Sequence, residues 1–237
     1  MGTGFTALAG CLGDDDSPTV LTPGDLSPAE GAGIPRNDDT LSSVELASPL
    51  HDQNVSTDEF VGERHTLLTY VFTRCTMACP LLTAALAMVQ ADAIEHGYEE
   101  DIVCMPITFD PEYDDDEQLI QFSESVGADP TRESWHFLRP DDSTHAKEVV
   151  EGTFGIAFER TDPDDETDMA FVHTSAITLV NRDGFVERTY AGQVPAATTV
   201  LDDTKTVVDA FEGPCDVEPS SLVRLVPWGL RRSNRSR

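Results

Sequence analysis

The sequence predicts an α/β fold in which a central mixed β-sheet is flanked by helices. Three observations lead to this prediction. Short β-rich apolar segments alternate with segments of helical periodicity, a turn with two cysteines joins the first such strand to a helix, and a hairpin signal comes near the end. The chain has 237 residues, of which 39% are hydrophobic, which suits one domain of ordinary size with a tail at each end.

The first half of the predicted domain contains two strands and a helix. Residues 64–72 form a short apolar run that is typical of a buried central strand. Residues 80–96 are rich in Ala, Leu and Met at helical spacing, and Pro80 suits the first helical position. Residues 102–109 are predicted to form a second strand. Pro106 lies inside this strand, which favours an edge position or a local irregularity.

The second half continues the alternation and adds a hairpin. The expected elements are a helix over 116–126, a short strand over 135–138, a helix over 143–154, two strands over 174–180 and 185–190, and a helix over 195–211. The last two strands flank Asp183-Gly184, a dipeptide typical of a tight hairpin turn. This order of elements is that of a thioredoxin-like fold, and the hairpin explains how parallel and antiparallel strands share one sheet.

The predicted domain spans residues 40–213, and both flanking segments differ from it in composition. In 1–39, Leu8-Ala9-Gly10-Cys11 is typical of a lipobox, whose cysteine acquires lipid. Only ten residues precede Cys11 and none is Lys or Arg, so we expect a truncated lipoprotein signal, followed by an acidic Pro/Gly-rich tether. Residues 214–237 are basic and are expected to be a disordered tail.

This N-terminal pattern predicts an extracytoplasmic location at the outer face of the cell membrane. Lipid on Cys11 is the expected attachment. No other segment approaches the roughly 18 apolar residues that a membrane-spanning helix needs. Contact with the membrane is therefore expected only through the lipid anchor.

The charge of the chain limits its partners. It has 44 Asp and Glu against 15 Lys and Arg, which gives a net charge of −29. Nucleic-acid binding is excluded as a function, because it needs basic residues to neutralise phosphates. A charged face that binds an anionic membrane is disfavoured for the same reason. The acidic residues are spread along the chain, which favours a solvated coat of a halophilic protein over a single acidic partner-binding face.

The segment from Thr73 to Pro80 contains the two cysteines that are the candidate reactive or metal-binding residues. Pro80 disfavours helical backbone at the residue before it, so we expect Cys75 in a loop and Cys79 at the amino-terminal end of the helix. The partial positive charge of a helix end stabilises thiolate and so activates a sulfur placed there. Two neighbouring thiols are suited either to disulfide chemistry or to binding a soft metal ion.

Four motifs occur in an order that resembles the Sco/SenC family. They are the strand followed by Thr73-Arg74-Cys75 and Cys79-Pro80, the segment Asp110-Pro111-Glu112-Tyr113-Asp114, the short match Trp135-His136-Phe137-Leu138, and His173 before a strand and hairpin. The resemblance covers roughly residues 40 to 212. The cysteine motif with its proline is the most specific of the four.

The resemblance implies a copper site and a function. Copper would be bound by the sulfurs of Cys75 and Cys79 and a nitrogen of His173, and this set suits both Cu(I) and Cu(II). The implied function is a metallochaperone that delivers copper to a respiratory cytochrome oxidase. Its partners would be the copper-receiving oxidase subunit or another copper chaperone. Many relatives have an acidic residue directly before the histidine, where this chain has Val172, and the nearest upstream acid is Asp168.

Other interpretations remain open on the sequence alone. A thiol–disulfide oxidoreductase would use Cys75 and Cys79 as a redox-active pair without needing His173. A peroxidase of the peroxiredoxin kind would use the reactive Cys75, although the proline expected upstream is missing. A structural disulfide is a further alternative, while structural zinc is disfavoured because only three ligands are found. Cys104 is predicted to be a small core residue, and Cys215 has no assigned role.

Overall fold

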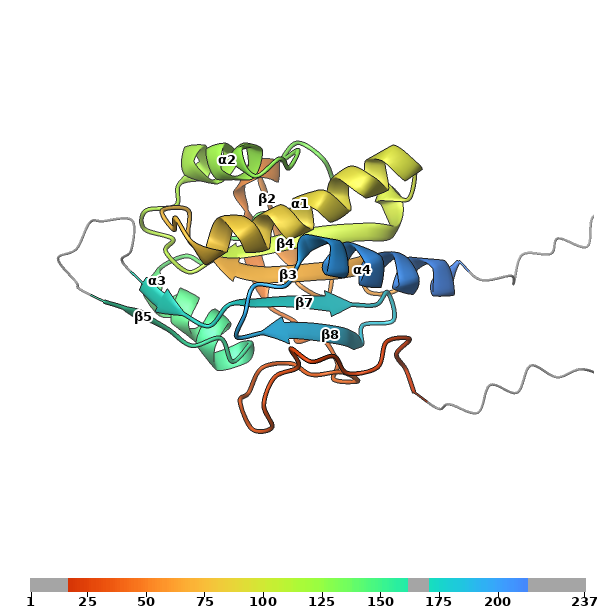
Figure 1. Cartoon of the computed structure of the whole chain (residues 1–237). Helices are drawn as coiled ribbons and strands as arrows, with labels where there is room; N and C mark the ends of the chain where they lie inside the picture. Colours follow the sequence, from red (N-terminus) through yellow and green to blue (C-terminus); the bar gives the residue numbers. More distant parts are fainter. Residues whose placement is uncertain (1–16, 162–170, 213–237) are drawn as a thin grey trace, which may run out of the picture.

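The computed structural model describes residues 17–161 and 171–212 of the chain, and its centre is a four-stranded β-sheet (Figure 1). The strand order is β4-β3-β7-β8. The strands are β3 (His65–Val71), β4 (Ile102–Thr108), β7 (Ala176–Val180) and β8 (Val186–Ala191). Strands β3 and β4 are parallel, while β7 is antiparallel to both β3 and β8. The predicted mixed sheet is therefore confirmed.

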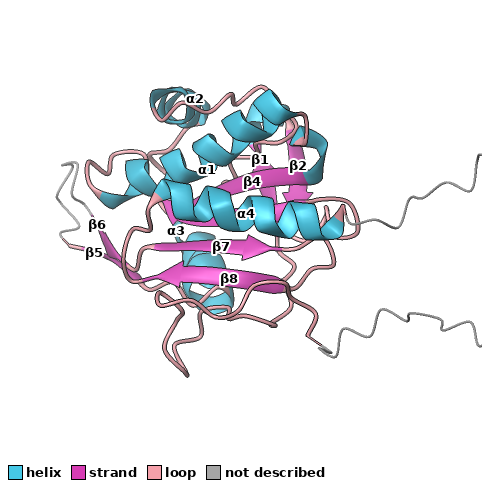
Figure 2. Ribbon diagram, turned by 45° about the vertical axis from the view of Figure 1, so that its right-hand side comes forward, coloured by secondary structure: helices cyan, strands magenta, loops and turns pink. Residues whose placement is uncertain are grey.

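Helices cover both faces of this sheet. On one face, α1 (Ala78–His96) and α4 (Ala197–Phe211) lie side by side (Figures 1 and 2). The opposite face is covered by α3 (Ser143–Ala146) and the π-helical turn η3 (Lys147–Thr153) that continues it. Helix α2 (Asp116–Ser125) lies beside α1. The remaining elements are short: β1 (Glu45–Ser48), β2 (Gln53–Ser56), β5 (Phe158–Arg160), β6 (Phe171–His173), η1 (Pro49–His51) and η2 (Glu99–Asp101).

Strand β3 is the middle of the core, as its apolar run predicts. All seven of its residues are buried, because helices cover the sheet on both sides. Neighbouring side chains point to opposite faces: Leu67 packs with α1 and α4, while Leu68 packs with the α3 side. The carboxyl end of β3 leads directly into the cysteine loop, so this strand fixes where that loop starts.

Pro106 lies where the sequence predicts, in an edge strand of the four-stranded sheet. Among the described residues, an irregular segment, 134–138, continues the hydrogen bonding beyond β4. The carbonyl of Pro106 accepts the amide of Leu138 at 2.7 Å, so the missing N–H of the proline faces this irregular segment and the ladder with β3 loses no bond. The strand expected over 135–138 forms only isolated bridges to β4.

Other elements differ from the prediction in extent. Helix α1 begins two residues before Pro80, which becomes its third residue. The helix expected over 143–154 forms as the short α3 and η3. The pairs β1–β2 and β5–β6 were not predicted from the sequence, because strands of three or four residues are too short to show an alternating pattern.

The segment before residue 40 differs from the expected tether over its described part. Residues 17–39 lie against the domain and are held by Glu187 of β8, whose side chain is fully buried. Its carboxylate accepts the amides of Val20 and Leu21, both at 2.8 Å, and the side-chain amide of Asn181 at 2.7 Å. The Pro/Gly-rich composition did not indicate this anchoring, because the anchoring bonds are donated by backbone amides, which every residue except proline has. Residues 1–16, including Cys11, lie outside the described part of the chain.

The described chain ends lie at one end of the sheet. Residues 17 and 212 are both near the amino-terminal end of β3, away from the cysteine loop (Figure 1). Within the described part of the chain, α1 has the length and apolar composition of a membrane-spanning helix, contrary to the expectation that no such segment follows Cys11. Half of that helix is buried in the domain, as is usual for a core helix.

The buried His65 predicts an acid-sensitive stability. Burial, together with the nearby Arg182 charge, lowers the pKa of His65 to about 4, and its Nδ1 accepts the Arg182 amide at 3.1 Å. The unfolded chain therefore binds a proton from about pH 6.5 downward, while the folded chain resists it until about pH 4. Stability falls as the pH falls through this window, by up to about 3 kcal/mol from this residue.

Replacing His65 tests this linkage. His65→Asn keeps an acceptor for the Arg182 amide and removes the titrating ring. Urea unfolding between pH 7 and 4 gives the slope of the free energy of unfolding against pH. This slope should be smaller for the variant, by the amount that corresponds to uptake of up to one proton on unfolding. Equal slopes for the variant and the wild type would contradict the role given to His65.

Candidate metal centre

The two cysteines lie where β3 gives way to α1. Cys75 lies in the loop and Cys79 is the second residue of α1, as the proline after it predicts. The loop turns tightly, with the amide of Cys75 donating to the carbonyl of Phe72 at 3.2 Å. Cys79 is fully buried and Cys75 is 7% exposed. Both cysteines are therefore buried, and Cys75 is the slightly more exposed residue of the two.

His173 approaches these sulfurs from the segment that leads into β7, the strand that pairs with β3. It ends β6, which pairs with β5, and it precedes the central strand β7 by two residues. The three ligand atoms, one each from Cys75, Cys79 and His173, all lie within 4.8 Å of one another. Nε2 of His173 is 3.3 Å from Sγ of Cys79. Residues far apart in the sequence are thus brought together with a spacing suited to one metal ion.

The backbone orients the histidine ring. Nδ1 of His173 lies 3.2 Å from the carbonyl oxygen of Thr174. A carbonyl only accepts, so Nδ1 carries the proton in this bond and Nε2 keeps its lone pair for the sulfurs or a metal. Metal-binding histidines commonly donate their second nitrogen in this way. The carbonyl of Thr174 therefore orients the imidazole in a chain that has Val172 where many relatives have an acidic residue.

The two thiols differ in acidity, a difference that the sequence alone left open. Hydrogen bonding from Cys79 lowers the pKa of Cys75 to about 4, against the opposing effect of burial, and the amides of Cys79 and Met77 make smaller contributions. Burial raises the pKa of Cys79 instead. The amides at the start of α1 point at the loop sulfur rather than at the sulfur within the helix. The Cys79 thiol and, to a smaller extent, these amides therefore favour the thiolate of Cys75.

Aromatic side chains surround the imidazole and limit its contact with water. The ring of Phe109 is 5.0 Å from that of His173, and the ring of Phe72 is 6.2 Å away. Phe171 packs against both phenylalanines, and Phe158 stacks on Phe109. An apolar surrounding of this kind strengthens metal–ligand electrostatics. Sequence analysis did not select these residues, because single phenylalanines at strand ends resemble ordinary core positions.

The acidic segment after β4 holds the cysteine loop. Asp114 is buried, and its carboxylate accepts the amide of Thr73 at 3.2 Å and the hydroxyls of Thr73 and Thr108. Burial raises the pKa of Asp114 to about 6. Asp110 pairs with Arg74 at 2.6 Å, with both side chains more than nine-tenths buried. Two carboxylates thus fix the two residues that precede Cys75.

Several residues noted in the sequence lie apart from this centre. Cys104 is a fully buried core thiol on β4, as predicted. Met77 lies between the two cysteines and is 64% exposed. Val172 is also exposed, beside His173. Cys11, Asp168 and Cys215 lie outside the described residues.

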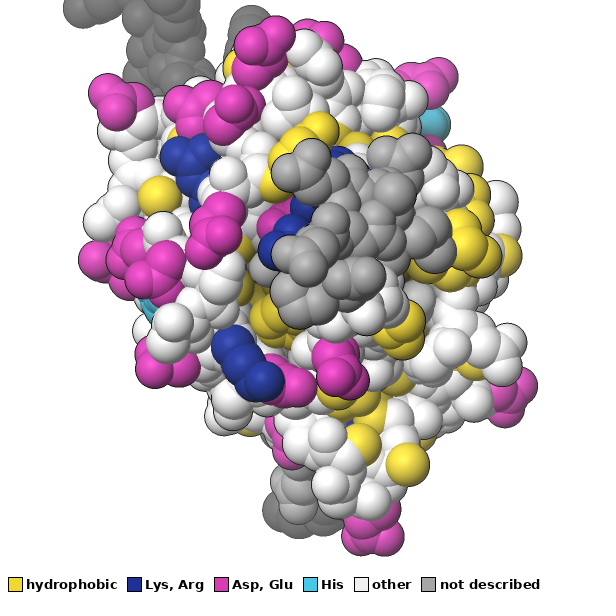
Figure 3. Space-filling model, turned by 90° about the vertical axis from the view of Figure 1, so that its left-hand side faces the viewer, with side chains coloured by type: hydrophobic (Ala, Val, Ile, Leu, Met, Phe, Trp, Pro, Cys, Tyr) yellow, Lys and Arg dark blue, Asp and Glu magenta, His cyan; other side chains and the backbone are white. Residues whose placement is uncertain are grey.

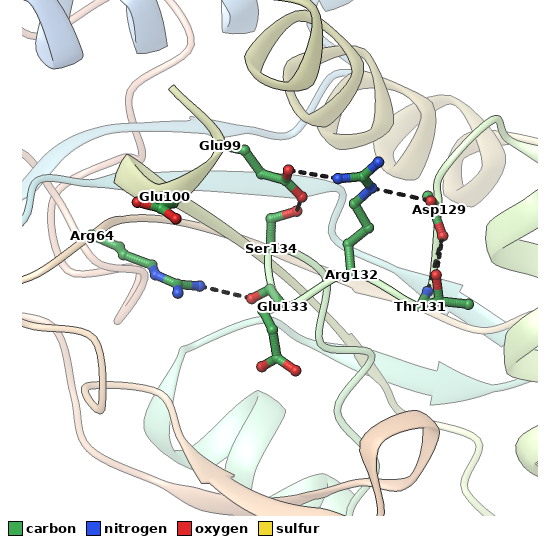
Figure 4. Close-up of a pocket in the computed structure, with 8 residues that line it drawn as sticks. All are labelled: Arg64, Glu99, Glu100, Asp129, Thr131, Arg132, Glu133 and Ser134. Carbon is green, nitrogen blue, oxygen red and sulfur yellow. Dashed lines mark hydrogen bonds and ion pairs between the residues drawn. The ribbon is translucent and has the colours of Figure 1, made fainter. Parts of the chain in front are cut away.

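A hollow at the other end of the sheet is lined mainly by charged and polar side chains (Figure 4). Its residues flank the starts of β3 and β4, whereas the cysteines follow the end of β3. Arg132 pairs with Glu99 at 2.8 Å and with Asp129 at 3.2 Å, and Arg64 donates to the carbonyl of Glu133. These charged groups satisfy one another, which is typical of surface structure.

Fold and site together define a class of protein. Two thiols and an imidazole converge at the carboxyl end of a central strand, on a mixed sheet flanked by helices. Soft sulfur donors with one imidazole favour thiophilic metals such as copper, and the same thiols are suited to redox exchange. The class is that of a thioredoxin-like protein with a thiol-based metal or redox centre.

Comparison with known proteins identifies the family. The SCO1/SenC family model matches residues 47–209, which is most of the chain, and this protein belongs to that family. The SCO1 protein homolog of Bacillus subtilis (strain 168) is 26% identical over 140 residues, which cover 59% of this chain and 68% of that protein.

Solved structures share the thioredoxin-like fold. A SCO1/SenC family lipoprotein from Bacillus anthracis (strain Ames) has a TM-score of 0.59 at 20% identity, covering 73% of this chain and 96% of its own. BsSco, described as having a disulfide switch and belonging to the Sco family of cytochrome c oxidase assembly proteins, has a TM-score of 0.56 at 23% identity, with coverages of 73% and 95%. Copper-bound ScoI from Bradyrhizobium japonicum has a TM-score of 0.54 at 17% identity, with coverages of 71% and 99%.

The buried ion pair beside the cysteine loop gives a stability prediction. Asp110→Asn should leave the Arg74 guanidinium buried without its counter-charge, at a cost of about 2–4 kcal/mol in the free energy of unfolding. Asp116→Asn is the matched control, because Asp116 pairs with Arg139 at the surface, where a pair contributes at most about 1 kcal/mol. Denaturant unfolding of the metal-free protein measures both. Equal costs for the two variants would contradict the anchoring role of Asp110.

Proposed function

We propose that this protein is an extracytoplasmic metallochaperone that binds copper through Cys75, Cys79 and His173 and delivers it to the copper centre of a respiratory cytochrome oxidase. The observation that carries the proposal is the convergence of these three ligand atoms within 4.8 Å. The copper bound to related Sco structures supports the choice of metal. The description of a relative as a cytochrome c oxidase assembly protein supports the choice of partner.

The donor set suits an ion that is carried and then released. Cys75 offers a thiolate and His173 an imidazole with its Nε2 lone pair free, while Cys79 must lose its proton as the metal binds. Two thiolates favour Cu(I), and the imidazole allows the same centre to accept Cu(II). Both cysteines are buried, and Cys75 is the more exposed residue at 7%. A receiving protein therefore reaches the metal from the side of Cys75.

Copper titration of the reduced, metal-free chain tests this proposal. The wild type should bind one copper per chain and, with Cu(II), show sulfur-to-copper charge-transfer absorption. Cys75→Ser, Cys79→Ser and His173→Ala should each weaken binding by at least about tenfold, because each removes one of three ligands. The matched controls are Cys104→Ser, a buried thiol outside the centre, and His96→Ala, an exposed imidazole; both should bind as the wild type does. A wild type without tight copper binding refutes the proposal.

The second candidate function is thiol–disulfide exchange on a partner protein. It is favoured by the neighbouring sulfurs and by their unequal exposure. The Cys75 thiolate would attack a partner disulfide and release one partner thiol. The Cys79 sulfur would then attack Cys75, closing the Cys75–Cys79 disulfide and releasing the second partner thiol. His173→Ala separates the two functions, because it should abolish tight copper binding and leave this exchange intact. The family match supports both functions over the peroxidase.

The location and the salt adaptation remain proposals. A lipoprotein among the structural relatives supports a lipid anchor on Cys11 at the outer face of the cell membrane. Mass spectrometry of the protein purified from native membranes tests the anchor, since an unmodified Cys11 would disprove it. The net charge of −29 supports a halophilic source.

Salt-dependent unfolding tests the halophilic proposal. Raising potassium chloride from 0.1 to 1 M shortens the screening length from about 10 to about 3 Å and so weakens repulsion within the acidic coat. The midpoint of thermal unfolding should therefore rise by several degrees. A midpoint that stays constant or falls would contradict salt adaptation.

A further inference from the structure

Helix α1 carries apolar side chains on its outward face as well as on the face that packs on the sheet. No charged residue occurs from residue 78 to residue 91. The residues that face outward are Met77, Leu81, Ala84, Met88 and Ala91, with exposed fractions of 64%, 58% and 39% for Met77, Leu81 and Met88. Leu81, Ala84, Met88 and Ala91 are spaced by three, four and three residues, so they follow one line along the helix, and Met77 adjoins this line from the loop before it. We name this line the α1 stripe.

The α1 stripe is unusual for the surface of this chain. Exposing apolar area costs roughly 25 cal/mol per Å², and contiguous exposed patches commonly mark binding sites. Among the described residues, eight large hydrophobic side chains are exposed. Three of them lie on the stripe, although the protein has 44 acidic residues with which to cover its surface. If exposed hydrophobic side chains were placed at random, we would expect them to be spread over the whole surface.

The stripe is continuous with the metal centre. It starts at Met77, which lies in the loop between Cys75 and Cys79. Val172, which is 65% exposed, adds apolar surface next to His173. The end of the molecule that carries the centre shows hydrophobic side chains exposed beside acidic ones (Figure 3). A molecule bound along the stripe would therefore extend to the metal ligands.

Acidic residues border the stripe on both sides. Helices α2 and α4 flank α1 and both contact it (Figure 1). Their outward positions include Glu117 and Glu124 on α2 and Asp202 and Asp209 on α4, all of them exposed. Lys205 of α4 is paired with Asp92 at 3.1 Å, so its charge is already matched. The surface is an apolar line between two negative borders.

This arrangement selects one kind of occupant. A second copy of the chain would bring negative borders face to face, and an anionic lipid surface would be repelled. The alternation of four and three is the spacing with which one helix packs along another. We propose that the α1 stripe docks a helix of a partner protein whose apolar face is bordered by Lys and Arg. This rests on the proposed function in one respect, that the docked partner gives or receives the metal.

A designed peptide tests the docking surface directly. The probe is a labelled helical peptide of about 20 residues with Leu at alternating spacings of three and four and Lys at the bordering positions. Fluorescence anisotropy measures its binding to the full, metal-free chain. The wild type should bind it at least about tenfold more tightly than a scrambled peptide of equal composition, and more tightly than a version with Glu in place of Lys.

Variants of the stripe locate the binding. Leu81→Gln and Met88→Gln should each weaken binding of the peptide by about fivefold or more. The matched control is Val61→Gln, because Val61 is 41% exposed and lies outside the stripe. The proposal is overturned if the scrambled peptide binds equally well, or if the stripe variants bind like the control. It is also overturned if sedimentation shows a dimer that Leu81→Gln dissociates, or if phosphatidylcholine vesicles bind the wild type and not that variant.

Copper titration of the same variants separates this inference from the proposed function. Leu81 and Met88 are not metal ligands, so both variants should bind copper as the wild type does. Peptide binding with no copper binding in the wild type would refute the chaperone function and leave the docking surface standing. Copper binding with no selective peptide binding would refute the docking surface alone.

Discussion

The geometry of the metal centre depends on how the end of β3 is held. The strand is buried on both faces, so its carboxyl end has one position relative to the sheet. Beyond it, the buried Asp114 accepts bonds from Thr73, and the buried pair of Asp110 and Arg74 fixes the next residue. Both carboxylates follow the neighbouring parallel strand, β4, whose carboxyl end lies beside that of β3. The cysteine loop is therefore tied to two central strands, and its sulfurs are placed before any metal arrives.

The centre combines a rigid interior with a reactive surface. His173 is oriented by the carbonyl of Thr174 and packed against phenylalanines, so its Nε2 faces the sulfurs. Hydrogen bonding from Cys79 stabilises the Cys75 thiolate, while burial keeps the Cys79 thiol protonated. Metal binding must displace that proton, so affinity is linked to pH. A centre with one thiolate and one protonated thiol is suited to binding an ion and also to releasing it.

The fold was largely predictable because its central elements carry strong local signals. The apolar run of β3, the Ala- and Leu-rich α1 and the Asp183-Gly184 turn each follow from composition and spacing. The ligand residues followed from family resemblance, since a lone histidine such as His173 has no local signal. The acidity of the two cysteines did not follow, because it depends on how deeply each is buried and on which thiol donates to the other. Anchoring of residues 17–39 by Glu187 was missed for a similar reason, as backbone amides leave no trace in composition.

The central claim is that two sulfurs and one imidazole nitrogen hold the copper. X-ray absorption spectroscopy of the full chain, reduced and loaded with one equivalent of Cu(I), tests it most directly. We expect two sulfur scatterers and one nitrogen scatterer around copper, with loss of the nitrogen in His173→Ala and of one sulfur in Cys75→Ser. A shell of nitrogen and oxygen alone, or a shell that these substitutions leave unchanged, would show that the copper binds elsewhere.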